Sequence, residues 1–245
     1  MTSPLDDYNR KRNFDRTAEP PGTAAPRDDG AAGGRDGRLR FAVQHHLASR
    51  DHYDLRLEWN GTLLSWAVPK GPSYNPRDKR LAVRVEDHPL DYRTFEGTIP
   101  QGEYGGGTVM LWDEGWWEPL VDVEQGLREG DLKFALHGHR LKGAWVLVHM
   151  KPKKGERDVN WLLIKEKDDY VRADAGIDGF ETSVQTGRTM DEIARGEDEA
   201  FAANPFDHVD VELAKLVNTT PPGDGWLFEV KYDGYRIVAY VEGGR

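Results

Sequence analysis

The residues best suited to chemistry stand at every second position of one short stretch. Three polar side chains alternate there with three apolar ones: His52, Asp54 and Arg56 with Tyr53, Leu55 and Leu57. Alternate residues of a β-strand point to the same face, so we expect an imidazole, a carboxylate and a guanidinium on one face and core residues on the other. His46 precedes the stretch closely enough to pair with it across a turn. Two histidines and one carboxylate suit a divalent transition metal with open positions, which lowers the pKa of bound water and polarises a phosphoryl oxygen.

The next alternating stretch places a second group of charged residues together. By the same periodicity, one face carries Arg80, Arg84, Glu86 and His88, and the other carries Leu81, Val83 and Val85. Arginine binds phosphate oxygens in bidentate fashion and stays charged when desolvated, and a histidine beside it can donate a proton to a leaving oxygen. Each residue alone is most simply a solvated side chain. Two consecutive strands that both carry histidine and arginine nevertheless predict an anion pocket beside the metal site.

Short stretches of alternating apolar residues dominate the sequence between residues 39 and 171. They are rich in β-branched and aromatic residues and are separated by glycine and proline, which predicts an all-β barrel or sandwich. The predicted strands are 40–45, 52–59, 62–67, 80–86, 107–112, 130–137, 143–150 and 160–166. The glycine-rich segment 100–107 lacks the Lys-Ser/Thr pair of a Walker phosphate loop, so we expect a structural connection between strands there.

The composition divides the rest of the chain into linkers and a second unit. Residues 1–38 form a charged arm and a connector rich in proline, glycine and alanine, which we expect to be flexible. Residues 172–205 are a second linker, with a short helix predicted from the capping-box spacing of Thr189 and Glu192 and the stop at Gly196. Residues 206–245 begin a new unit, which we expect to be a fragment because its strand pattern ends abruptly.

The composition also excludes several classes of protein. The 245 residues include no cysteine, which excludes disulfides, thiol nucleophiles and cysteine-ligated metals. No apolar run is long enough to span a membrane, and the polar N-terminus is not a signal peptide, so we expect a cytoplasmic protein without a membrane partner. The net charge of −10 argues against coating of long DNA, but residues 1–100 carry 16 Lys and Arg against 15 Asp and Glu. A local basic cluster can therefore still hold a phosphate.

Taken together, the ordered motifs resemble the 3′-phosphoesterase domain of bacterial DNA ligase D, an enzyme of non-homologous end joining. They are the segments 43–46 (VQHH), 52–56 (HYDLR), 65–72 (SWAVPKGP), 85–92 (VEDHPLDY) and 99–107 (IPQGEYGGG), and the similarity extends over about residues 5–170. The resemblance implies a compact β-barrel with a Mn²⁺-dependent phosphoesterase activity. This activity removes a 3′ ribonucleoside and then the 3′-phosphate, and it leaves a 3′-OH. The implied partners are DNA 3′ ends of a primer-template at the bacterial nucleoid. Whether an end-bridging repair protein or a polymerase domain is also a partner stays open.

The resemblance also assigns roles to individual residues by their motif position. The metal ligands are His46, His52 and Asp54; the catalytic contacts are Arg56, Arg80 and His88; the substrate contacts are Gln44, Lys70, Glu86, Tyr92, Arg12 and Glu19. Mn²⁺ is the implied metal, and other divalent transition metals stay open. Two positions depart from the family pattern, since Asn13 stands where aspartate is expected and His45 where lysine is common.

A second resemblance lies near the C-terminus. The segment 229–236 (EVKYDGYR) is similar to the nucleotidyl-acceptor motif of ATP-dependent DNA ligases, in which Lys231 would carry AMP as a nucleophile. Residues 206–245 are therefore expected to be the truncated start of a ligase adenylation domain. We expect Lys231 to be inactive here, because the further strands that would hold ATP do not follow it.

Two other functions are compatible with the same residues. A His-x-Asp pair with a distant histidine on a β-barrel also binds iron in Fe(II)-dependent oxygenases, although neighbouring arginines favour a phosphate substrate. The other alternative is a non-catalytic DNA-end-binding module whose site has decayed, and the intact set of histidine, aspartate and arginine side chains speaks against it. Turnover of a 3′-phosphate oligonucleotide with Mn²⁺ would distinguish the three.

Overall fold

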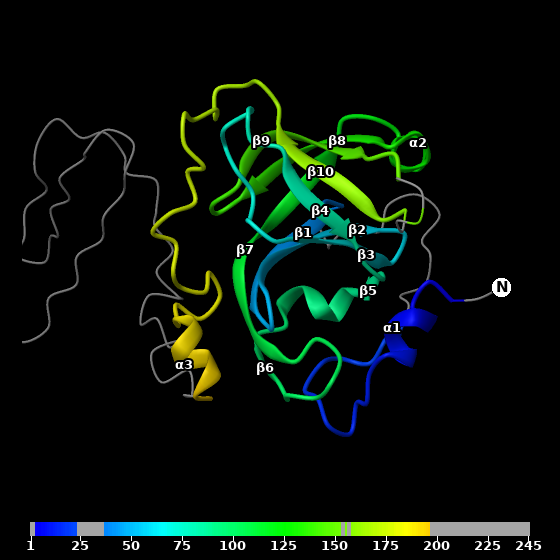
Figure 1. The fold of residues 1–245 in the computed structure, drawn as a ribbon, viewed down its shortest axis with the longest axis vertical. Helices are drawn as coiled ribbons and strands as arrows, with labels where there is room; N and C mark the ends of the chain where they lie inside the picture. The colour runs from blue at the N-terminus through cyan, green and yellow to red at the C-terminus, as the bar shows by residue number, and fades with distance from the viewer. Residues whose placement is uncertain (1–2, 24–36, 153–154, 156–157, 197–245) are drawn as a thin grey trace, which may run out of the picture. The chain divides into compact units, whose positions relative to one another are not determined.

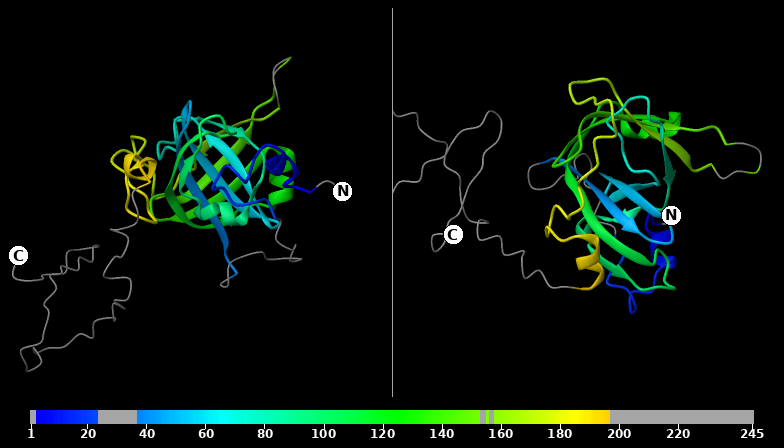
Figure 2. Two further views of the ribbon diagram at one scale, coloured as in Figure 1. Left: turned by 90° about the horizontal axis from the view of Figure 1, so that it is seen from below. Right: turned by 60° about the vertical axis from the view of Figure 1, so that its left-hand side comes forward.

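The computed structural model describes residues 3–23, 37–152, 155 and 158–196. Within these residues, eight antiparallel strands form a closed barrel (Figures 1 and 2). In order around it they are β1 (Leu39–Leu47), β2 (Asp51–Trp59), β3 (Thr62–Val68), β4 (Arg80–Arg84), β10 (Asn160–Lys165), β9 (Lys142–His149), β8 (Asp131–Gly138) and β7 (Gly107–Pro119), which pairs with β1. The predicted barrel is confirmed. All eight predicted strands are present, and their ends agree within two residues except that β7 runs seven residues further.

Five short elements are not predicted by the sequence, because two to seven residues carry too little periodicity. They are α1 (Asp6–Arg10), β5 (His88–Pro89), the 3₁₀ helix η1 (Leu90–Thr94), β6 (Gly97–Ile99) and α2 (Val123–Glu129). Asp122 caps α2 by accepting a hydrogen bond from the Gln125 amide, and Gly130 ends it with φ near +75°. Strand β5 pairs antiparallel with β3, and η1 follows β5 directly. These two elements become walls of the site described below.

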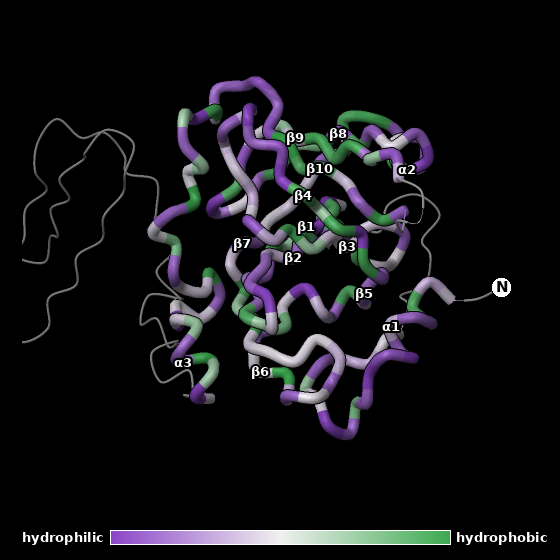
Figure 3. Tube along the Cα trace, viewed as in Figure 1, coloured by the Kyte–Doolittle hydropathy of each residue, from purple (hydrophilic) through white to green (hydrophobic). Residues whose placement is uncertain are grey.

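The barrel interior holds the main hydrophobic core. All eight barrel strands contribute buried side chains to it, among them Phe41, Leu57, Trp66, Ala82, Trp112, Phe134, Trp145 and Leu163. Figure 3 colours the chain by hydropathy and shows hydrophobic residues (green) along the barrel strands. Leu55 and Leu57 belong to this core, so the alternation of β2 places Asp54 and Arg56 on the outer face of the barrel wall. The predicted separation of the two faces of 52–57 is therefore confirmed.

A second apolar cluster covers the outer face of β3 and β7. It combines Leu63 of β3 and Val109 of β7 with residues of η1, of its flanks and of the N-terminal segment. From that segment, Leu5 and Tyr8 have no exposed surface. The Tyr8 hydroxyl donates a 2.7 Å hydrogen bond to the Pro20 carbonyl. Residues 5–22 are thus packed on the barrel, which corrects the expectation of a flexible arm. Leu5, just before α1, and Tyr8, on α1, find a complementary surface that composition cannot reveal.

The segment after β10 also packs against the barrel as far as Ile193, which is 3% exposed. Its helix α3 (Met190–Ala194) is the predicted one, with both hydrogen bonds of the capping box between Thr189 and Glu192, and Gly196 follows with φ near +64°. No helix among the described residues is long and apolar enough to cross a membrane. The predicted ligase-like unit 206–245, with Lys231, lies outside the described residues.

Candidate active site

A cavity of about 240 Å³ opens on the outer wall of the barrel, where β1 ends and β2 begins. Its lining comes from segments far apart in the sequence: Arg12, Glu19, His46, Ala48, Ser49, His52, Asp54, Arg56, Ala67, Val85, Glu86, His88, Tyr92, Ile99, Tyr104 and Gly105. Nine of the twelve site residues assigned to this domain from the sequence are among them. The structure does not bring Gln44, Lys70 and Arg80 into this lining.

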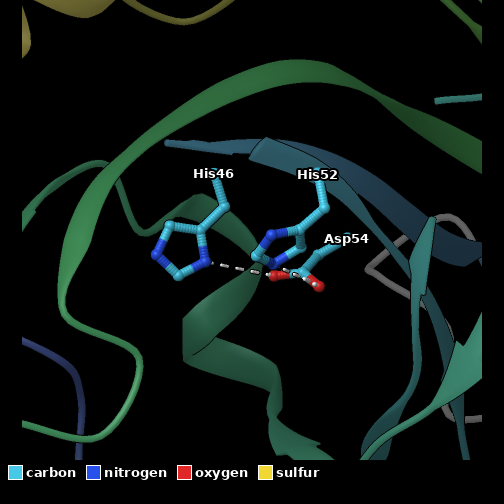
Figure 4. A group of neighbouring side chains, drawn as sticks. All are labelled: His46, His52 and Asp54. Atoms are coloured by element: carbon cyan, nitrogen blue, oxygen red, sulfur yellow. Dashed lines mark ion pairs between the residues drawn. The ribbon is translucent and has the colours of Figure 1, made fainter. Parts of the chain in front are cut away.

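The two histidines and the aspartate meet at the β1–β2 hairpin (Figure 4). His46 stands directly opposite His52 in the antiparallel register, and Asp54 follows two residues further on the same face of β2. Asp54 Oδ2 lies 3.8 Å from His46 Nδ1, and Asp54 Oδ1 lies 3.6 Å from His52 Nε2. One potential ligand atom from each of the three residues lies within 4.8 Å of the others. This spacing is compatible with ligands that share one cation.

The donor set fits a transition metal. The His52 ring places Nδ1 2.8 Å from the Arg50 carbonyl, so Nδ1 carries the hydrogen and Nε2 keeps a lone pair for a ligand. His46 Nε2 is buried and has no hydrogen-bond partner among the described residues. Burial alone would raise the pKa of Asp54, but the Arg56 guanidinium and the two imidazoles outweigh it and lower the pKa to about 2. The carboxylate is therefore charged at any physiological pH and able to bind a cation.

Arg56 is held rigidly at the floor of the cavity. Its guanidinium donates hydrogen bonds to Gln44 Oε1 at 2.6 Å, to Ser65 Oγ at 2.9 Å and to Asp54 Oδ2 at 3.0 Å. Gln44, which is fully buried, donates in turn to the Tyr92 carbonyl at 3.0 Å. Gln44 therefore orients Arg56 and links it to η1, which differs from the expected contact between Gln44 and substrate.

Arg12 supplies the second arginine of the cavity, and it comes from the N-terminal segment. Its guanidinium, 4% exposed, donates to Glu19 at 2.8 Å and to Glu86 at 3.1 Å. It also lies 3.8 Å above the ring of Tyr8, a cation–π contact that fixes its plane. Two carboxylates and an aromatic ring therefore orient the Arg12 guanidinium toward the cavity. Its Nη2 lies 3.1 Å from Nε2 of His88.

His88 is a neutral imidazole in this environment. Its burial, followed by the charges of Arg56 and Arg12, holds its pKa well below the ordinary value. Nδ1 lies 2.9 Å from the Glu86 carbonyl, so Nδ1 donates and Nε2 accepts from Arg12. The ring can therefore donate a proton to a leaving group only after its pKa has risen.

The predicted alternation of 80–88 does not hold. Ala82 is fully buried in the barrel core, whereas Leu81 is 42% exposed, the reverse of the expected faces. The guanidinium of Arg84 lies 4.7 Å from the core-side ring of Trp66. Strand β4 ends at Arg84, and the irregular connection before His88 resets the alternation. Only three residues of this stretch line the cavity: Val85, Glu86 and His88.

Arg80 and Lys70 lie together in a neighbouring hollow of about 410 Å³. Arg80 is paired there with Asp78 at 3.0 Å. This hollow starts at Pro69, two residues beyond Ala67 of the first cavity. Arg80 therefore does not line the cavity that holds Arg56, whereas Arg12 does.

Three other residues complete the comparison with the sequence. Asn13 is exposed and bonds the Asp15 amide, and His45 stacks on Tyr53 at 4.3 Å, on the opposite face from His46. The sequence predicts a structural connection over 100–107, but Tyr104 of that segment lines the cavity and is 46% exposed. The signal that could have revealed it is an aromatic residue followed directly by three glycines.

These features define an antiparallel β-barrel with a metal-type site of two histidines and one aspartate, beside two arginines in one cavity. Residues 44–149 match the family described as the DNA Ligase D 3′-phosphoesterase domain, and this part of the chain belongs to that family.

Relatives extend the similarity over nearly the whole chain. The multifunctional non-homologous end joining protein LigD of Pseudomonas aeruginosa is 45% identical over 264 residues, which cover 99% of this chain and 30% of the relative. The LigD repair protein of Mycobacterium tuberculosis is 35% identical, with 97% of this chain and 26% of the relative covered. LigD of Mycolicibacterium smegmatis is 34% identical, with 98% and 27% covered. The chain therefore spans less than a third of the length of these relatives.

Proposed function

We propose that this chain is a metal-dependent 3′-phosphoesterase of DNA repair, which removes 3′ ribonucleosides and 3′-phosphates from broken ends and leaves 3′-OH groups. The observation that carries the proposal is the meeting of Arg12, Arg56 and His88 with the His46–His52–Asp54 group in one cavity. The family match and the names of the relatives support the same reading. The substrate would be a primer-template with a 3′ ribonucleotide or 3′-phosphate, in the bacterial cytoplasm at the nucleoid.

The metal would be held by His46, His52 and Asp54. Imidazole nitrogens favour Mn²⁺ or another divalent transition metal over Mg²⁺, which prefers an all-oxygen shell. When bound, such an ion supplies a Lewis acid for phosphoryl oxygens and lowers the pKa of water. The chain's own residues perform the steps that follow.

Arg56 and Arg12 stabilise the negative charge of the phosphoryl group in the transition state. Arg56 is already fixed by its bonds to Gln44, Ser65 and Asp54, so no reorganisation is needed when charge develops. Preorganised donors of this kind are the largest electrostatic contribution in many enzymes. Arg12 adds a second guanidinium to the same cavity, and each arginine keeps at least one N–H group for a charge-assisted hydrogen bond to a phosphate oxygen.

His88 protonates the leaving oxygen, and water is the nucleophile. In the free site the charges of Arg56 and Arg12 contribute to the low pKa of His88. A bound phosphate compensates those charges and raises the pKa of His88. The imidazole then binds a proton at Nε2 in place of the hydrogen bond from Arg12 and can transfer it to the departing group.

An Fe(II) oxygenase is the second candidate, because two histidines and one carboxylate with open positions also suit iron. Two arginines in the cavity favour the phosphoesterase. The decisive test is incubation of the chain with a primer-template that ends in one 3′ ribonucleotide, with Mn²⁺, with Mg²⁺ or with chelator. We expect shortening of the primer with Mn²⁺, much less with Mg²⁺ and none with chelator. Turnover of 2-oxoglutarate with Fe²⁺ and no DNA product would overturn the proposal, and DNA binding without turnover would instead indicate an end-binding module.

A further inference from the structure

A third hollow, of about 790 Å³, lies between the loop after β3 and the segment after β10. In Figure 1 these segments are turquoise and yellow-green. Three cationic side chains line it, Arg77, Lys167 and Arg172, and all three are exposed. The proposed mechanism uses none of them, and Lys167 and Arg172 lie outside the residues 44–149 that match the family.

The hollow is built by a fixed backbone rather than by mobile surface side chains alone. The Tyr74 amide donates to the Ala175 carbonyl at 2.8 Å, and the Arg172 amide donates to the Tyr74 carbonyl at 3.2 Å. The Asn75 side chain donates to the Ala173 carbonyl at 2.8 Å. Tyr74 itself is 3% exposed. The two segments that carry the cations are therefore joined to each other and to the core.

The charge of the hollow is positive. Its one acidic side chain, Asp168, already accepts hydrogen bonds from Lys165 Nζ at 2.5 Å, from the Ala144 amide at 2.7 Å and from the Tyr170 amide at 2.9 Å. Arg77, Lys167 and Arg172 form no ion pair among the described residues. In a chain of net charge −10, this concentration of unpaired cations is a local anion-binding surface.

The second hollow, that of Lys70 and Arg80, shares a lining residue with the third hollow and begins close in sequence to the active-site cavity. Arg77 lines both the second and the third hollow, and Pro69 of the second follows Ala67 of the cavity by two residues. Cationic side chains therefore line all three hollows. Several separate positive sites match the repeating phosphates of a nucleic-acid backbone.

We propose that the hollow of Arg77, Lys167 and Arg172 binds the phosphodiester backbone of the DNA duplex behind the 3′ end that occupies the cavity. The proposal rests on the proposed function for the identity of its ligand. This surface would position long substrates and lower their KM, and it would not contact the reacting phosphate.

The test compares the variant R77Q/K167Q with the matched control R128Q/K151Q, which removes two equally exposed cations elsewhere. Binding of a fluorescein-labelled primer-template is measured by anisotropy over a range of salt. Each lost phosphate contact lowers the magnitude of the slope of log affinity against log salt by about 0.9. For the two substitutions we therefore expect this magnitude to fall by about 1.8 and the affinity to fall several-fold. The variant's KM for the primer-template should rise similarly at unchanged kcat, whereas turnover of a 3′-phosphorylated trinucleotide, which has no duplex behind the reacting end, should be unchanged.

A wild-type salt slope in R77Q/K167Q would overturn the proposal, as would an equal loss in the control variant. The outcome is separate from that of the proposed function. If the wild-type chain turns over neither substrate, the proposed function fails, and the salt slopes still decide whether this surface binds DNA.

Discussion

Arg12 and His88 stand 76 positions apart in the sequence, yet the Arg12 guanidinium donates a 3.1 Å hydrogen bond to Nε2 of His88. Arginine has donors only, so Nε2 must present a lone pair. The pair fixes one neutral tautomer of the imidazole, with Nδ1 donating to the Glu86 carbonyl. The N-terminal segment thereby sets the protonation state of a residue at the cavity.

This arrangement predicts how stability depends on pH. Burial and the charges of Arg56 and Arg12 keep the native His88 neutral, whereas the unfolded chain protonates it below about pH 6.5. The unfolded state then binds more protons, so the free energy of unfolding should fall as the pH drops below about 6.5. His88→Gln should flatten this fall by up to about 1.4 kcal/mol per pH unit. Urea unfolding at several pH values in the acidic range measures this pH dependence, with His45→Gln as the control. If the free energy of unfolding falls equally steeply with pH in wild type and His88→Gln, the assignment of a neutral native His88 is contradicted.

Arg56 should matter chiefly for the rate. Arg56→Ala removes a fixed donor from the cavity, and we expect kcat to fall roughly tenfold to a thousandfold. Arg56→Lys should restore only part of it, because an ammonium lacks the planar fork that bonds Gln44, Ser65 and Asp54. Steady-state kinetics on a 3′-phosphate primer checks this. Full rescue by lysine would mean that the position supplies charge alone.

Arg80 should matter chiefly for substrate binding, because it lies in the neighbouring hollow and not beside the metal-type site. We expect Arg80→Ala to raise KM for a primer-template with a smaller change in kcat. The same assay with Arg56→Ala is the internal comparison. A loss confined to kcat would show that Arg80 reaches the reacting phosphate.

Removal of a metal ligand should abolish turnover without unfolding the chain. His52→Ala and Asp54→Asn each remove a ligand at the cavity, outside the barrel core, and a bound ion contributes several kcal/mol of charge stabilisation. We expect losses of at least about a hundredfold together with weaker Mn²⁺ binding by calorimetry and unchanged circular dichroism. Near wild-type turnover with Mn²⁺ still bound would overturn the ligand assignment.

The packing of the N-terminal segment can be tested at Leu5, which is fully buried. Leu5→Ala should lower the free energy of unfolding by about 2–4 kcal/mol. Activity should fall as well, since Arg12 and Glu19 lose their support. The matched control is Leu120→Ala, at a side chain that is 50% exposed. A wild-type midpoint in urea for Leu5→Ala would mean that the segment is not docked in solution.

The sequence alone determined the strands and the local part of the site. Period-2 alternation depends on nothing but neighbouring residues, so it placed Asp54 and Arg56 on one face, and a short turn brought His46 opposite His52. The capping box of Thr189 and Glu192 was equally readable, because both of its hydrogen bonds lie within four residues.

Only the tertiary structure decided which face of β4 is the outer wall and what covers the outer wall of the barrel. Closure of the barrel put Ala82 inside and Leu81 outside, since alternation restarts wherever a strand ends. Arg12 entered the cavity because Leu5 and Tyr8 bury themselves against η1 and the barrel wall, a surface that exists only once the fold has formed. Contacts between residues this far apart depend on the packing of the whole domain, and no local pattern in the sequence encodes them.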